Sequence, residues 1–226
     1  MAKVVIGYDD INFKALRNNM LESANHNGLW YYSHTIVDKI APLLDTKRPI
    51  DAIGKQTCGC VDDAIIFIHS NIHTEETYGW LKRYHNLIMV CNCQATADKL
   101  HEMFPYDHQI VLPVSVDVEE VLSHKHKKDQ EECYAGNMWD FKKTDIEKLV
   151  PPTAHRFGVM PREQLLDVIS RYKKVYAVGL TAVEARILGA EIGVCDSRFP
   201  DPDYWQPLDY KDAAKMLQQK IDEIDR

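Results

Sequence analysis

The segment KKVYAVGLTAVEARILGAEIGV, residues 173–194, predicts a strand, a tight turn, a helix and a second strand. The first strand is apolar enough to be buried, and Gly179 ends it. Thr181 stands at the expected N-cap of the helix, and Glu184 follows three residues later, which is the spacing of a capping box. Gly189 ends the helix before the second strand begins. The segment therefore predicts an α/β fold.

The start of this predicted helix has two interpretations. A helix that begins behind a glycine turn offers unpaired backbone N–H groups and a positive dipole end, which together hold an anion and most often a phosphate. The same turn occurs in many α/β proteins that bind nothing there, and Glu184 would then do no more than cap its own helix. Both interpretations stay open at this point.

Length and charge narrow the class of protein. The chain has 226 residues, 45% of them hydrophobic, which is enough to bury a core in one large domain or two small ones. A formal net charge of −7 argues against sequence-independent binding of nucleic acid over a broad basic face, although a local basic groove is compatible with this charge. No apolar run approaches the roughly 20 residues needed to cross a bilayer. The start, MAKVVIGYDD, resembles a first strand rather than a signal peptide, so we expect a cytoplasmic protein.

The cysteines include two C-x-C pairs, Cys58-Gly-Cys60 and Cys91-Asn-Cys93. Such pairs suggest zinc, but common zinc sites space their cysteines by about two to four residues. The second pair also lies at the end of an apolar run, where free thiols behave as small buried hydrophobes. We expect reduced, buried thiols and no metal ligands.

Apolar runs and amphipathic segments alternate along the first half of the chain. Lys3–Tyr8 predicts a strand, and the continuous apolar runs Ala64–Ile68 and Leu87–Cys91 predict strands that are covered on both faces. Alternation of strands with helices predicts a mainly parallel sheet with right-handed crossovers. Ligands of such sheets collect at the carboxyl ends of the strands, where Asp10 and His69 follow two of these runs.

The clearest break in composition is Ser123–Glu132, SHKHKKDQEE, where charge and histidine replace any apolar period. We interpret it as a linker, with a single exposed helix as the alternative. The predicted organisation is an N-terminal domain over residues 1–122, a linker over 123–132, and a C-terminal domain over 133–226.

Two blocks, Leu87–Val121 and Tyr134–Val194, carry motifs of a known family. The first ends in a P-x-x-V-D exit formed by Pro113, Val116 and Asp117, and the second contains YAGNMWDFKK, HRFGVMPREQLLDVI and GLTAVEARILGAEIGV. In this order the chain resembles a short GT-B glycosyltransferase with a donor domain of the glycosyltransferase-4 kind. The resemblance implies two Rossmann-like domains with parallel sheets that face a cleft. It also implies transfer of a sugar from a nucleotide-diphosphate sugar.

The resemblance implies a donor site built from three segments. In the family a glycine and basic residues face the diphosphate, an F-G-x turn lies against the nucleotide base, and a late glycine and glutamate hold the phosphate and the ribose. The corresponding residues here are Gly136, Lys142, Lys143, Phe157, Gly158, Val159, Gly179, Leu180, Thr181 and Glu184. The chain departs from the family at Asn137, where an arginine is common, and at Tyr176, where a second acidic residue is common.

The chemistry needs charge neutralisation on the leaving diphosphate, which the helix N-terminus and Lys142 or Lys143 can supply without a metal ion. An inverting transfer also needs a base, for which His69 and Asp10 are the candidates.

The nucleotide sugar is a co-substrate and no other cofactor is expected. The acceptor stays open among a glycan, a lipid-linked sugar, a protein, a small molecule and a modified DNA base. The alternatives are a non-catalytic nucleotide- or sugar-binding module of the same fold and a nucleotide-sugar epimerase.

Overall fold

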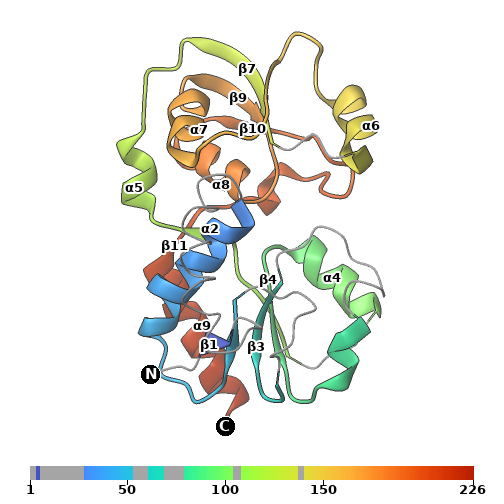
Figure 1. Ribbon diagram of the computed structural model, residues 1–226, viewed down its shortest axis with the longest axis vertical. Coiled ribbons are helices and arrows are strands. Elements are labelled where there is room, and N and C mark those ends of the chain that lie inside the picture. Colours follow the sequence, from blue (N-terminus) through green and yellow to red (C-terminus); the bar gives the residue numbers. More distant parts are fainter. Residues whose placement is uncertain (1–3, 6–27, 53–60, 69–78, 104–107, 137–139) are drawn as a thin grey trace.

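The computed structural model describes residues 4–5, 28–52, 61–68, 79–103, 108–136 and 140–226. Within them the chain is an α/β protein with one parallel sheet in each half of the molecule (Figure 1). A short parallel pair of strands forms a third, two-stranded sheet. The predicted α/β class with parallel sheets is therefore confirmed.

The first half holds a five-stranded sheet in which the order of the strands in space follows their order in the sequence, β1-β2-β3-β4-β5. Its elements are β1 (Val4–Val5), α2 (Gly28–Thr35), the π-helical turn η1 (Ile36–Ile40), the short helix η2 (Ala41–Leu43), β2 (Ile50–Asp51), β3 (Ile65–Ile68), the short helix η3 (Gly79–Arg83), β4 (Ile88–Cys91), α4 (Gln94–Met103) and β5 (Gln109–Val111).

Strands β3 and β4 are covered on both faces, as their continuous apolar sequences predict. Side chains alternate along a strand, so Ile65 and Phe67 belong to the core that contains Ile36 of η1, while Ile66 belongs to a second core with Leu100 of α4. Helices on opposite faces therefore seal the centre of this sheet.

The second half holds a four-stranded sheet in the order β10-β9-β7-β8. The elements from the exit of the first sheet onward are β6 (Ser115–Val116), α5 (Val118–Ser123), β7 (Gln130–Ala135), α6 (Asp140–Leu149), β8 (His155–Phe157), α7 (Arg162–Ile169), β9 (Tyr172–Tyr176), α8 (Leu180–Ile187), β10 (Glu191–Gly193), the short helix η4 (Pro202–Tyr204), β11 (Leu208–Asp209) and α9 (Tyr210–Ile224).

The order of this second sheet reverses at the neighbouring strands β7 and β9. From β7 the chain moves outward to β8, and from β9 it moves the opposite way to β10. Tyr134 of β7 packs with Ile146 of α6 on one face, while Val175 of β9 packs with Leu166 of α7 and Ala182 of α8 on the other. In open α/β sheets such a reversal leaves a crevice at the carboxyl ends of the two central strands.

The last helix, α9, returns to the first half of the molecule (Figure 1). Gln218 of α9 accepts a hydrogen bond from the backbone N–H of Asp45 at 2.8 Å and donates one to its carbonyl oxygen at 3.1 Å. Arg48 binds Asp225, just beyond the helix, with N–O distances of 2.7 and 2.9 Å. The segment 133–226, predicted as one C-terminal domain, thus contributes a helix that packs against η1 and η2 of the first half.

The two halves also share buried apolar contacts. A single core cluster includes Ile36 and Val90 from the first half and Val183 and Leu188 from the second. Between the halves, the predicted linker 123–132 contains the end of α5, a stretch without regular secondary structure over 124–129 and the start of β7. The alternative of one exposed helix over this segment is wrong.

Helix α5 forms over Val118–Ser123 because the Asp117 carboxylate caps it, accepting the Glu120 backbone N–H at 3.1 Å. The predicted linker therefore begins at the last residue of this helix.

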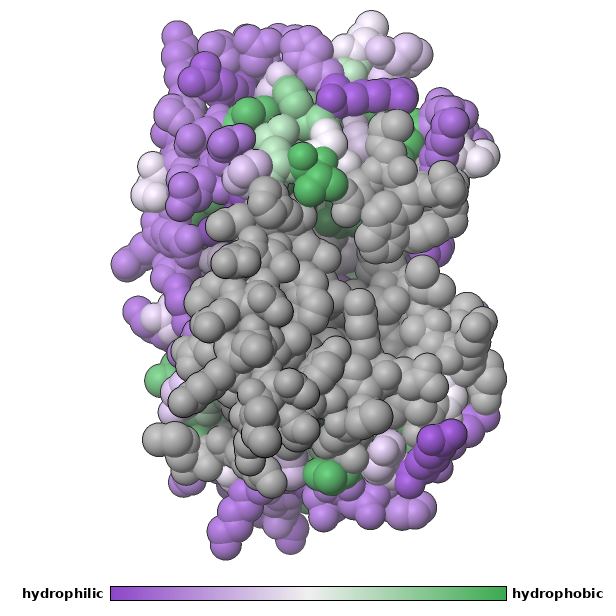
Figure 2. All heavy atoms as spheres, viewed as in Figure 1, coloured by the Kyte–Doolittle hydropathy of each residue, from purple (hydrophilic) through white to green (hydrophobic). Residues whose placement is uncertain are grey.

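The described surface seen in Figure 2 is mainly hydrophilic, with small separate apolar areas. Leu43 of η2, Val159 in the turn after β8 and Met216 of α9 are exposed apolar residues. The buried free thiols include Cys91 and Cys93, as predicted, and these two pack in different core clusters.

Candidate functional site

The candidate site lies at the carboxyl edge of the second sheet. Gly136 follows β7, Gly158 follows β8, and Gly179 comes three residues after the end of β9. Because these strands are parallel, all three glycines lie at one edge of the sheet. The register pairs Ala135 with Phe157, and the Gly136 N–H donates to the Phe157 carbonyl oxygen at 3.3 Å. The segments singled out in the sequence are thus brought together at the point where the strand order reverses.

Gly179 occupies a backbone conformation that glycine adopts far more easily than other residues, with φ 64° and ψ −137°. No heavy atom lies within 4 Å of where its Cβ would be. It is the N-cap of α8, and its carbonyl oxygen accepts the N–H of Val183 at 3.1 Å. The glycine is therefore required by the turn, and the space beside it is open.

The predicted N-cap at Thr181 is wrong, because α8 begins at Leu180 and Gly179 is its cap. Within the described residues no side chain caps this helix, so backbone N–H groups of its first turn have no capping partner. Glu184 lies too far into α8 to act in a capping box. The uncapped N–H groups and the positive dipole end that favour an anion are thus present at the start of α8. The turn that exposes them is formed by Gly179 rather than by Thr181.

The turn after β8 has an open side. A Cβ on Gly158 would meet no heavy atom within 4 Å, and the next residue, Val159, is 60% exposed. Phe157 is partly buried, and its ring lies edge-on to that of Tyr172 with the centroids 5.8 Å apart. The turn therefore has open space beside Gly158.

Helix α6 follows β7 and forms the neighbouring wall. Lys142 and Lys143 fall in its first turn, and the side chain of Lys143 is exposed. Asp145 of α6 accepts hydrogen bonds from the backbone N–H and hydroxyl of Ser197, at 2.9 and 2.7 Å, in the loop after β10. These bonds fix α6 across the carboxyl edge of the sheet.

Glu184, predicted to hold a ribose, is 1% exposed and paired with an arginine. Its Oε1 accepts a hydrogen bond from Nε of Arg162 at 2.7 Å. Burial raises the pKa of Glu184, and the Arg162 guanidinium opposes that rise. Burial alone would lower the pKa of Arg162, but the surrounding Glu184, Tyr31 and Glu120 raise it overall. The Glu184 carboxylate therefore has a protein partner inside the fold.

Tyr176, where the family commonly has an acidic residue, also makes its contacts within the protein. Its hydroxyl donates to Oε2 of Glu132 at 3.2 Å, and its ring packs with Ile146 and Cys195. Burial raises the pKa of this phenol, so it stays neutral near pH 7.

Arg162 is the residue that the sequence analysis missed. It is the first residue of α7, where a positive charge is unfavourable because it faces the positive end of the helix dipole. An arginine at such a place signals a carboxylate partner elsewhere in the chain. The predicted catalytic residues His69 and Asp10, and the departure at Asn137, lie outside the described residues.

No protein-family model matches the sequence, and no curated protein matches it either. Among solved structures the chain is similar to one titled "Crystal structure of AviGT4, a glycosyltransferase involved in Avilamycin A biosynthesis". The identity is 13%, the TM-score is 0.44, and the match covers 87% of this chain and 81% of that one. At this level the function has to be argued from the residues of this chain. In the part of the chain that is described, no helix has the length and apolar character to cross a membrane.

Proposed function

We propose that this protein is a metal-independent glycosyltransferase that binds a nucleotide-diphosphate sugar at the carboxyl edge of its second sheet. The observation that carries the proposal is the reversal of strand order between β7 and β9, with Gly136 and Gly179 directly beyond those strands. The sequence motifs that resemble a donor domain fall at this edge, which supports the proposal independently of any overall structural match.

The proposed chemistry follows from the charge that develops in the reaction. When the bond between the sugar and the diphosphate breaks, negative charge grows on the leaving phosphate. Backbone N–H groups at the start of α8 and a lysine in the first turn of α6, Lys142 or Lys143, would neutralise that charge. His69 and Asp10 are proposed as candidates for the base that activates the acceptor hydroxyl. The acceptor itself is left open.

A second candidate is a non-catalytic module that binds a nucleotide or a sugar with the same fold. Two observations favour it, namely the pairing of Glu184 with Arg162 and the packing of Tyr176 on the sheet. Both positions hold side chains that the glycosyltransferase-4 pattern would direct to the donor. In this case the edge of the sheet would bind the ligand and no sugar would be transferred.

Binding is tested with a panel of UDP-, GDP-, TDP- and CMP-sugars in a thermal-shift measurement. A ligand at about 100 times its dissociation constant stabilises a protein by about 2.7 kcal/mol. Lys143→Ala should weaken binding of the nucleotide sugar that stabilises the protein. Lys148 is an exposed lysine in the last turn of the same helix, and Lys148→Ala should leave that binding unchanged. Equal weakening by both substitutions, or no stabilisation by any nucleotide sugar, would contradict the proposed site.

Catalysis is tested by incubating the protein with the nucleotide sugar that binds and following release of the free nucleoside diphosphate. Slow hydrolysis without an acceptor supports the transferase over the binding module. Binding without any release, across a panel of acceptors, supports the binding module.

A further inference from the structure

A buried polar cluster lies where the two halves of the molecule meet. Its centre is Arg162, which is 7% exposed. The Nε of Arg162 donates to Oε1 of Glu184, and its Nη1 donates to Oε1 of Glu120, both at 2.7 Å. The Arg162 guanidinium carbon lies 3.7 Å from the centre of the Tyr31 ring, and the Tyr31 hydroxyl donates to the other oxygen of Glu120 at 2.9 Å. We call these four residues the Arg162 cluster.

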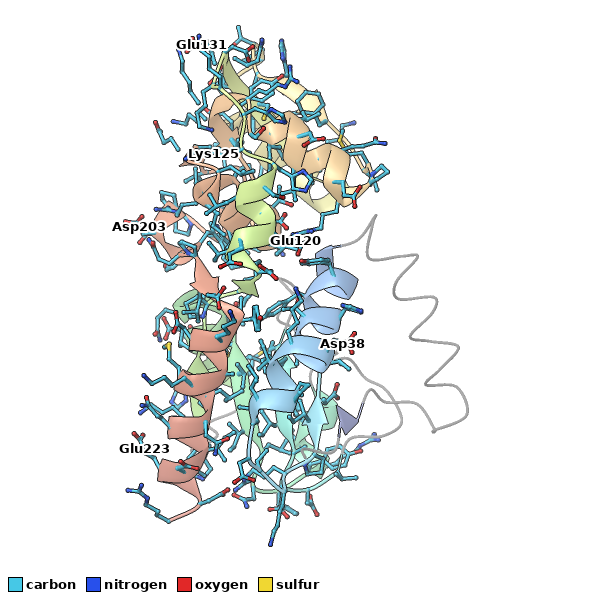
Figure 3. All side chains as sticks on the ribbon, turned by 90° about the vertical axis from the view of Figure 1, so that its left-hand side faces the viewer. Asp38, Glu120, Lys125, Glu131, Asp203 and Glu223 are labelled. Carbon is cyan, nitrogen blue, oxygen red and sulfur yellow. The ribbon has the colours of Figure 1, made fainter. Side chains whose placement is uncertain are left out.

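The four residues come from four helices. Tyr31 belongs to α2 of the first half, and Glu120 belongs to α5, the helix through which the chain leaves that half. Arg162 and Glu184 belong to α7 and α8, which cover one face of the second sheet. Figure 3 labels Glu120 where α5 lies between α2 and the helices of the second half. The cluster therefore joins both halves through a single guanidinium.

The Arg162 cluster differs from the apolar contacts around it because hydrogen bonds depend on the direction of their donors and acceptors. Residues such as Tyr32, Val121 and Val183 share the surrounding core, and apolar contacts of this kind tolerate repacking when total volume is kept. A guanidinium that bonds two carboxylates and stacks on a ring fixes all three partners at once, because its donors form a rigid planar fork. A slide of α2 or α5 along α8 would leave a buried charge without its partner.

The Arg162 cluster also lowers the stability of the fold in one respect, so its presence needs an explanation other than stabilisation. Among the described residues, the buried Nη2 of Arg162 has no hydrogen-bond partner. A well-packed apolar group at this place would avoid both that unpaired group and the desolvation of the charges. Buried ionic groups that persist at a cost in stability are attested as devices that specify one arrangement of helices.

We propose that Arg162 fixes the orientation of the second sheet relative to the first, acting as an ionic lock between the two halves. The proposal goes beyond the proposed function, because it concerns the resting protein and needs no ligand. Without the lock, the shared apolar core would still hold the halves together, but in a range of relative orientations.

The test measures the distance between labels placed at His101 of α4 and Glu147 of α6, two exposed positions in opposite halves. Labels are introduced as unnatural amino acids, so that the native cysteines stay unmodified. Arg162→Met should broaden the distance distribution while the far-ultraviolet circular dichroism stays that of the wild type. Lys173→Met removes an exposed ion pair with Glu131 in the second half and should leave the distribution unchanged.

A folded Arg162→Met variant with the narrow distribution of the wild type would overturn the proposal. If that variant does not fold, two further variants are measured instead. Arg162→Lys keeps the positive charge but loses the planar fork of donors. The Tyr31→Phe/Glu120→Gln double variant weakens the contacts of Arg162 with the first half. Broadening in either variant supports the lock, and unchanged distributions in both would exclude it.

Discussion

The aromatic ring of Tyr176 lies directly against the backbone of Gly193 on the neighbouring strand. The two residues are paired in the register of β9 and β10, and a Cβ on Gly193 would lie 2.3 Å from Cδ1 of the tyrosine. No side chain fits at residue 193 unless the ring moves, so the glycine is required by a close approach rather than by its backbone conformation. The ring also meets α6, which gives Tyr176 a packing role at the position where the resembled family has an acidic residue.

Gly193→Ala should therefore lower the free energy of unfolding by about 1–3 kcal/mol, the usual cost of forcing atoms into a packed site. Tyr176→Ala removes the Cγ, Cδ1 and Cε1 atoms that the new methyl group would meet, so the double variant should be less destabilised than the sum of the two single effects. Urea unfolding of the four proteins in the cycle measures this coupling, expected at about 0.5–3 kcal/mol. Strict additivity would show that the ring and the glycine do not meet in solution.

Gly158→Val probes the proposed nucleotide site without touching the core. No heavy atom lies within 4 Å of the position of its Cβ, so the free energy of unfolding should change by no more than about 0.5 kcal/mol. A side chain there would occupy the space proposed for the nucleotide base and should weaken binding at least about tenfold, or about 1.4 kcal/mol. Titration calorimetry with the nucleotide sugar that binds gives the affinity. Undiminished affinity in the folded variant would remove this turn from the site.

Lys39→Met should flatten the loss of stability in acid. The hydrogen bond from Lys39 to Asp117 at 2.8 Å lowers the pKa of the Asp117 carboxyl below its ordinary value. A carboxyl with a lowered pKa in the folded state stabilises the fold above the unfolded pKa of about 3.9, and this contribution is lost as pH falls through the folded pKa. The wild type should thus lose more stability than Lys39→Met between neutral pH and the acid limb.

Urea midpoints of both proteins at pH 7 and across the range below about pH 4 measure this difference. Lys99→Met, which removes an exposed pair with Glu102 on α4, is the matched control and should follow the wild type. An identical acid limb in all three proteins would mean that Asp117 titrates normally.

Arg48→Met should release the end of α9 from the first half. Arg48 donates to the carbonyl oxygens of Asp63 and Asn86 at 3.1 and 3.0 Å as well as to Asp225. Loss of these partly buried hydrogen bonds from a charged donor should cost about 1.5–3 kcal/mol. Asp225→Asn leaves the two carbonyl bonds in place and removes only a partly exposed ion pair, so it should cost less than about 1 kcal/mol.

Guanidinium unfolding combined with hydrogen exchange of α9 measures both the cost and its location. Exchange in α9 should accelerate more in Arg48→Met than in Asp225→Asn. Equal exchange rates in the two variants would show that the carbonyl contacts do not hold the helix.

The candidate site could be found from the sequence in part. Gly179 was predicted to form a turn because it stands between an apolar run and a predicted helix, and it does occupy such a turn, whereas Gly136 and Gly158 were implied by the family resemblance. The partner of Glu184 was not found, because Arg162 lies 22 residues away, and its place at the start of a helix does not show which carboxylate it meets. Spacing predicted a helix cap for Glu184 and the family resemblance implied a ribose contact, whereas in the structure its carboxylate lies inside the fold. The assignments of His69 and Asp10 stay predictions.

By itself the sequence determined the local elements. The strands β3 and β4 follow from uninterrupted apolar runs, and the turn before α8 follows from a glycine, because periodicity and backbone freedom are properties of neighbouring residues. Only the tertiary structure decided the strand order of the second sheet, the return of α9 to the first half and the joining of both halves through Arg162. These features rest on contacts between residues far apart in the chain, whose energies no local pattern encodes.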